Sequence, residues 1–164
     1  MKKKLLIIKK FGGTSLSSVE KIKKAAGLIK KEITLGNKVV VVVSALGKTT
    51  DKLQLLINKI SRNGSSEEID SILSSGEQAS SGLMALALKD INVEARSFLG
   101  WQIPILTNSS YGKAKILDID SKILKNEIKK GVIPVIAGFQ GISNKFRIST
   151  ICLLYTSPSP RDRG

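Results

Sequence analysis

The sequence predicts an α/β fold built on a largely parallel sheet. Short aliphatic segments alternate with longer segments of helical periodicity, and glycine-containing turns separate them. The most apolar segments are β-branched runs without polar alternation, which is typical of strands buried on both faces. With 164 residues, the chain is long enough for one domain and too short for two.

The first half of the chain shows this alternation most clearly. Residues 4–9 (KLLIIK) predict a strand, and a glycine turn joins it to a helix whose apolar side chains recur at helical spacing over residues 19–29. Gly36 ends that helix. Residues 38–43 (KVVVVV) predict a buried strand, and residues 51–60 predict a helix with one apolar face.

The second half repeats the pattern with shorter strands. Proline at position 134 weakens the last strand, because proline cannot donate a ladder hydrogen bond. The expected elements are helices at 67–73, 78–89 and 120–130, and strands at 92–98, 103–107, 113–117 and 132–137.

Lysine and arginine outnumber aspartate and glutamate by 27 to 13, which gives a formal net charge of +14. Such a charge attracts nucleic acids, whose phosphates release counterions on binding. The cations are spread along the chain, several on the polar faces of expected helices, and only 4% of residues are aromatic. We therefore do not expect a nucleic-acid partner. A non-catalytic basic module that binds phosphate ligands or nucleic acid is the alternative function.

The composition also restricts the chemistry. Histidine is absent and Cys152 is the only cysteine, which excludes histidine acid–base catalysis, Cys/His zinc sites and an internal disulfide. The longest aliphatic run, residues 39–43, is too short to span a bilayer. Residues 5–8 are too short for the apolar part of a signal peptide. We expect a cytoplasmic protein without a membrane partner.

The turn KFGGTS at residues 10–15 lies between the first strand and the first helix. Its glycines let the backbone approach an anion such as a nucleotide phosphate, and Lys10 adds a positive charge. The turn is equally explained as a tight connection, in which the segment 17–20 (SSVE) forms a capping box.

The segment 44–50 (SALGKTT) also follows a strand and precedes a helix. It is not a P-loop, because that motif requires glycine where Val42 stands. The segment still places hydroxyl groups at the carboxyl end of a buried strand, where open α/β sheets bind ligands. Alternatively, Thr49 or Thr50 caps the next helix.

Acidic residues at two further places have a structural and a chemical interpretation. The segment 74–77 (SSGE) fits a capping box, whereas Glu77 could hold the ammonium group of a small substrate. Asp118 and Asp120 could bind a metal, but solvated surface acids are commoner. We expect no metal ligand in the chain.

Five motifs occur in one order: KFGGTS at 10–15, VVVSALGKTTD at 41–51, SGE at 75–77, SFLGWQ at 97–102 and AGFQGIS at 137–143. Together they resemble the aspartate kinases of the amino acid kinase superfamily. The resemblance covers residues 4–150 and implies a three-layer αβα sandwich. It also implies ATP-dependent phosphorylation of the β-carboxylate of L-aspartate, the first step of lysine, threonine and methionine biosynthesis, by an enzyme that is a homo-oligomer.

The resemblance assigns roles to residues. Lys10 is the implied catalytic residue, which stabilises the transferring phosphoryl group. ATP is implied to bind at Lys10, Phe11, Gly12 and Gly13. Aspartate is implied to bind at Ser44, Thr50 and Glu77. Magnesium is implied to bridge the phosphates through substrate oxygens and water.

The resemblance stops near residue 150. The family continues RITTLGRGGSD, whereas this chain has RIST at 147–150 and then ICLLYTSPSPRDRG. We therefore expect residues 1–150 to be the N-terminal part of a catalytic domain, and residues 151–164 to be a non-native or disordered tail. The 164-residue chain is then expected to be catalytically inactive and, with sheet edges uncovered, prone to aggregation.

Overall fold

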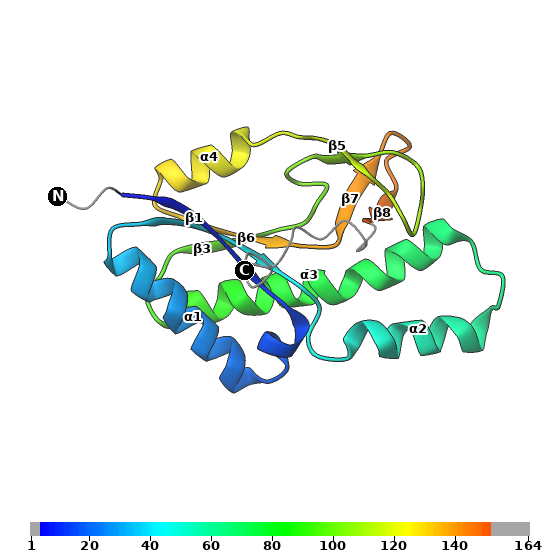
Figure 1. Cartoon of the computed structure of the whole chain (residues 1–164), viewed down its shortest axis with the longest axis horizontal. Helices are drawn as coiled ribbons and strands as arrows, with labels where there is room; N and C mark the ends of the chain where they lie inside the picture. The colour runs from blue at the N-terminus through cyan, green and yellow to red at the C-terminus, as the bar shows by residue number, and fades with distance from the viewer. Residues whose placement is uncertain (1–3, 152–164) are drawn as a thin grey trace, which may run out of the picture.

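The computed structural model describes residues 4–151. They form two four-stranded sheets, four α-helices and a 3-10 helix (Figure 1). In chain order the elements are β1 (Leu6–Phe11), η1 (Gly13–Leu16), α1 (Val19–Thr34), β2 (Lys38–Val43), α2 (Thr49–Ile60), α3 (Ser66–Asp90), β3 (Ala95–Phe98), β4 (Ile105–Thr107), β5 (Ile116–Ile119), α4 (Lys122–Lys129), β6 (Ile133–Ala137), β7 (Gln140–Ser143) and β8 (Ile148–Thr150).

The first sheet is parallel, with the strand order β1-β2-β6-β3. This confirms the predicted parallel sheet. β6 is an interior strand although it contains Pro134, which lies opposite Arg96 of β3. Proline removes one donated hydrogen bond from the ladder, but every residue of β6 is buried. Apolar burial therefore holds the strand in the sheet.

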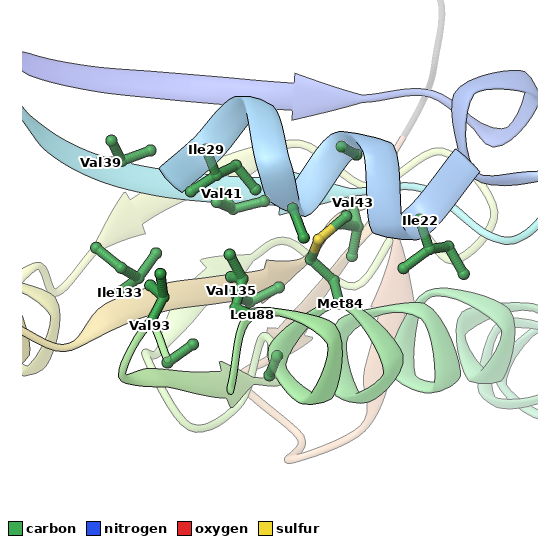
Figure 2. Packing of buried hydrophobic residues seen from close by; sticks show 14 of the residues in the cluster. Ile22, Ile29, Val39, Val41, Val43, Met84, Leu88, Val93, Ile133 and Val135 are labelled. Atoms are coloured by element: carbon green, nitrogen blue, oxygen red, sulfur yellow. The ribbon is translucent and has the colours of Figure 1, made fainter. Parts of the chain in front are cut away.

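Helices cover both faces of this sheet: α1 and α3 lie on one face and α4 on the other (Figure 1). The expected three-layer αβα arrangement is confirmed. Because strand side chains alternate between faces, Val39, Val41 and Val43 of β2 point toward α1 and α3. There they meet apolar side chains of both helices and of β6 (Figure 2). Val40 packs on the opposite face with a smaller cluster that includes Phe98.

The second sheet has the strand order β5-β4-β7-β8 and mixes antiparallel and parallel pairs. The sequence predicted neither β7 nor β8. These strands are short, and their pairing depends on partners distant in sequence. Gly141 of β7 shows the constraint, because a Cβ there would lie 2.6 Å from the Ile105 carbonyl oxygen of β4. The absence of a side chain permits the pairing.

Three local predictions were wrong. The expected helices at 67–73 and 78–89 are one helix, α3, so the segment 74–77 lies inside a helix and is not a capping box. The capping box at residues 17–20 is wrong by one position, because the N-cap of α1 is Ser18 and not Ser17. The Ser18 Oγ accepts a hydrogen bond from the Lys21 N–H. Lys48 is the N-cap residue of α2, so neither Thr49 nor Thr50 caps it.

The apolar face expected on residues 51–60 is only partly covered. Ile57 is buried, whereas Leu56 and Ile60 are exposed. Of the expected tail at 151–164, only Ile151 lies within the described residues; it is half-buried and bridges to Ala114. Among the helices of residues 4–151, none is long and apolar enough to cross a membrane.

Candidate active site

A cavity of about 830 Å³ opens on the α4 side of the parallel sheet, where α4 and the second sheet form its other walls. Most of its wall is aliphatic. Polar groups line it where β1, β2 and β6 end and α3 passes. Five of the seven predicted site residues line this cavity: Lys10, Gly13, Ser44, Thr50 and Glu77. Phe11 and Gly12 are not among the lining residues.

The alternation of β1 decides which side chains reach the cavity. Leu6, Ile8 and Lys10 line it, whereas Phe11 points to the other face and packs against the core beneath α1 and α3. The Phe11 carbonyl accepts a hydrogen bond from the Ser44 N–H at 3.0 Å, which fixes the two strand ends together. Lys10 is exposed and brings a positive charge to this end of the cavity.

The two glycines after β1 have different roles in the structure. At Gly13 a Cβ would lie 2.8 Å from the Ala45 carbonyl oxygen, and the Gly13 carbonyl accepts a hydrogen bond from the Gly47 N–H at 3.0 Å. Gly13 therefore lets the two loops pack together. At Gly12 a Cβ would meet nothing within 4 Å. The space beside Gly12 is open to a ligand.

Ser44 and Thr50 come from the loop after β2 and from the first turn of α2. Both are half-buried and line the cavity. Thr49 does not, because its Oγ1 donates to the Leu46 carbonyl at 2.6 Å within the loop. The first-turn N–H groups of α2 add partial positive charge near Thr50.

Glu77 is the most deeply buried acid of the cavity wall. It lies in the middle of α3 and is 4% exposed. Its Oε1 accepts a hydrogen bond from the Ala45 N–H at 3.0 Å, but no described residue donates to Oε2. Burial raises the pKa of Glu77 above its usual value. Among residues 4–151, no lysine or arginine forms a salt bridge with this carboxylate.

Close packing of α3 on the loop puts Glu77 in this position. At Gly76 a Cβ would lie 2.8 Å from the Ala45 Cβ, so glycine allows the helix to approach the loop. The motif 75–77 thus places a glycine at the contact with the loop and a carboxylate in the cavity wall.

Sequence reasoning missed Gln140, at the start of β7. Its side chain is buried and lines the same cavity. The residue stands within the motif AGFQGIS, but glutamine has no chemistry that singles it out in a sequence. The left-handed backbone of Phe139, with φ of 63°, marks the turn that directs β7 toward α3.

In the sequence, Asp118 and Asp120 were the acids that could bind a metal. Within residues 4–151, no three Cys, Asp or Glu side chains gather in a way that could hold a metal ion. Asp118 is exposed. Asp120 accepts a hydrogen bond from the Lys122 N–H at 2.9 Å through Oδ1, and so serves the start of α4.

The polar end of this cavity lies at the carboxyl ends of parallel strands, where open α/β sheets bind their ligands. Residues 5–152 match the model of the amino acid kinase family, and the chain belongs to that family.

Individual relatives narrow the comparison to aspartokinases. The chain is 46% identical over 149 residues to the aspartokinase of Rickettsia bellii, and 45% identical over 146 residues to aspartokinase 2 of Bacillus subtilis. Each match covers 89% of this chain, which spans 37% and 36% of the length of these relatives.

Solved structures agree. The aspartate kinase of Synechocystis superposes with a TM-score of 0.72 at 38% identity, covering 91% of this chain and 24% of that protein. E. coli aspartokinase III, in complex with aspartate and ADP, superposes with a TM-score of 0.73 at 20% identity over 91% of this chain and 43% of that one. At that identity the second comparison supports the fold alone.

Proposed function

We propose that the protein to which this sequence belongs transfers the γ-phosphoryl group of ATP to the β-carboxylate of L-aspartate. A carboxylate oxygen attacks the γ-phosphorus, the bond from that phosphorus to the β,γ-bridging oxygen breaks, and ADP leaves. The product is β-aspartyl phosphate. The observation that carries the proposal is the convergence on one cavity of Lys10, Ser44, Thr50 and Glu77 from distant parts of the chain.

The residues present suit this reaction. A carboxylate is already a nucleophile, so the transfer needs positioning and charge stabilisation and no general base. Lys10 supplies a positive charge toward the transferring phosphoryl group. Glu77 supplies a buried negative charge toward the substrate ammonium. Ser44 and Thr50 line the same cavity and add hydroxyl groups.

The nucleotide site fits at Gly12, where the backbone is free of steric obstruction, with Lys10 beside it. Phe11 and Gly13 belong to the proposed ATP site through their main chain, which shapes the turn. Magnesium is proposed to bind with the ATP phosphates, through substrate oxygens and water. When bound, it would neutralise phosphate charge.

The whole protein is proposed to be a cytoplasmic homo-oligomer in which residues 1–150 contribute part of the catalytic domain. The source gene should first be sequenced across the codons for Thr150 and Ile151, and the resulting reading frame expressed. We expect ATP-dependent formation of aspartyl hydroxamate from L-aspartate and hydroxylamine. The 164-residue chain by itself is expected to give none.

Lys10→Ala should reduce the turnover of that expressed protein by about 10²- to 10³-fold. Lys9→Ala is the matched control, because Lys9 lies on the other face of β1 and pairs with Glu32 at 2.9 Å. Equal activity of the Lys10 variant and the wild type would contradict the assignment. Salt-sensitive DNA binding that ignores ATP and aspartate would favour the basic module instead.

A further inference from the structure

Two buried acceptor atoms in the cavity wall have no donor. Among the described residues, Glu77 Oε2 and Gln140 Oε1 are the buried side-chain atoms that lack a hydrogen-bond partner. The two residues are 4% and 1% exposed, respectively. Both line the same cavity. A buried polar atom without a partner is uncommon and calls for an explanation.

The hydrogen bond of Gln140 fixes which of its amide atoms is unpaired. Its Nε2 donates to the Ser74 carbonyl of α3 at 3.1 Å. A flipped amide would place an oxygen against that carbonyl oxygen, and neither could donate. Oε1 is therefore the unpartnered atom. Ser74 lies one helical turn before Glu77, so Gln140 is held against the part of α3 that carries the carboxylate.

The pair determines the chemistry of its ligand. An ionised carboxylate and an amide oxygen both accept hydrogen bonds, so the ligand has to donate at least two. An ammonium group has three donors and carries the charge that compensates Glu77. A hydroxyl supplies one donor and no charge. A primary ammonium group therefore has both the donors and the charge that these two atoms require.

We propose that Gln140 is a specificity-determining residue, which binds the substrate α-ammonium group together with Glu77. The inference rests on the proposed function, because that function places an amino acid in this cavity. It adds that the amide oxygen, and not the carboxylate alone, selects a primary ammonium group over the same molecule without one.

The test compares binding of L-aspartate and of succinate, which lacks only the amino group, to the protein expressed from the sequenced reading frame, by isothermal titration calorimetry. Wild type is expected to prefer aspartate. Gln140→Met keeps the volume and removes the acceptor, so the preference should fall about tenfold to hundredfold. Gln54→Met, on α2, should leave it unchanged. The ratio of the two affinities does not depend on the folded fraction, because unfolding lowers the apparent affinity for both ligands by the same factor. An unaltered ratio in Gln140→Met overturns the inference.

A second measurement separates this inference from the proposed function. If wild type shows no preference for aspartate, the substrate assignment loses support, and the pKa of the Glu77 carboxyl is then compared in equal concentrations of methylammonium and tetramethylammonium chloride. We expect methylammonium alone to lower that pKa, and Gln140→Met to remove the difference. No difference in wild type overturns the ammonium site itself.

Discussion

The two halves of α3 bury different kinds of side chain. Toward its C-terminus, Met84, Ala85 and Leu88 enter the apolar core formed with α1, β2 and β6 (Figure 2). Toward its N-terminus, the buried residues include Asp70, Ser74 and Glu77. One helix thus joins an apolar half, which stabilises the fold, to a polar half, which carries the candidate site.

The polar half is held by directed contacts. The Asp70 carboxylate accepts hydrogen bonds from the Gly112 N–H at 2.9 Å and 3.0 Å, and from the Thr150 N–H and Oγ1, each at 2.7 Å. These bonds tie α3 to the second sheet. The stabilisation from hydrogen bonds falls when their geometry changes, whereas the stabilisation from apolar contacts depends mainly on the buried area.

The largest effect is expected in the apolar half. Leu88 is fully buried, and Leu88→Ala should lower the free energy of unfolding by about 2–5 kcal/mol, because it loses apolar burial and leaves a cavity. Chemical denaturation measures this. Leu86→Ala, at a side chain 65% exposed on the same half, should change it by less than about 0.5 kcal/mol. Equal losses in the two variants would contradict the conclusion that buried side chains in this half of α3 stabilise the fold.

In the polar half, Asp70→Asn replaces an acceptor oxygen with a donor that faces N–H and O–H groups. We expect a loss of about 2–3 kcal/mol in the free energy of unfolding. Amide exchange should also accelerate at the N–H groups of Gly112 and Thr150. Asp90→Asn, at the exposed end of the same helix, is the control and should be within about 0.5 kcal/mol of wild type.

Two glycines of α3 test whether close packing on the site loop matters. Gly76→Ala should cost about 1–2 kcal/mol, because its methyl group would overlap the Ala45 side chain. At Gly82 an added Cβ meets nothing within 4 Å, so Gly82→Ala should stabilise the helix by about 0.5–1 kcal/mol. Thermal unfolding distinguishes the two. If Gly76→Ala stabilises the protein instead, the loop moves to accommodate the added methyl group without cost.

The last predicted effect depends on pH. Burial raises the pKa of Glu77 in the folded chain, so between the unfolded and folded pKa values the folded chain holds a proton that the unfolded chain has released. The free energy of unfolding should therefore fall as pH rises from about 4 through the folded pKa. Each unit of elevation corresponds to about 1.4 kcal/mol.

Glu77→Gln keeps an oxygen for the Ala45 N–H and should remove this slope. The variant should equal the wild type near pH 4 and exceed its stability above the folded pKa. Glu94→Gln, at an exposed carboxylate, should preserve the slope. An identical pH dependence of stability in wild type and Glu77→Gln would contradict the elevated pKa.

The sequence predicted the elements whose periodicity is strong. The valine run of β2 and the amphipathic pattern of α1 form the expected strand and helix, because their side chains encode which face is buried. It failed on the middle of α3, where Ser74 and Gly76 suggested a helix end. The helix is instead continuous here. The Ser74 hydroxyl donates a hydrogen bond to the Ser71 carbonyl, and Gly76 lets the helix pack closely against Ala45.

The candidate site divides in the same way. Lys10 and Glu77 were proposed from the resemblance carried by the motifs that contain them, and both line the cavity. Gln140 and Asp70 were not, since a polar residue acquires its role only from the groups that surround it after folding. By itself, the sequence determined the fold class and suggested the charged residues of the candidate site. The tertiary structure decided which acceptors remain buried without a donor, because desolvation and hydrogen-bond pairing are properties of packed neighbours.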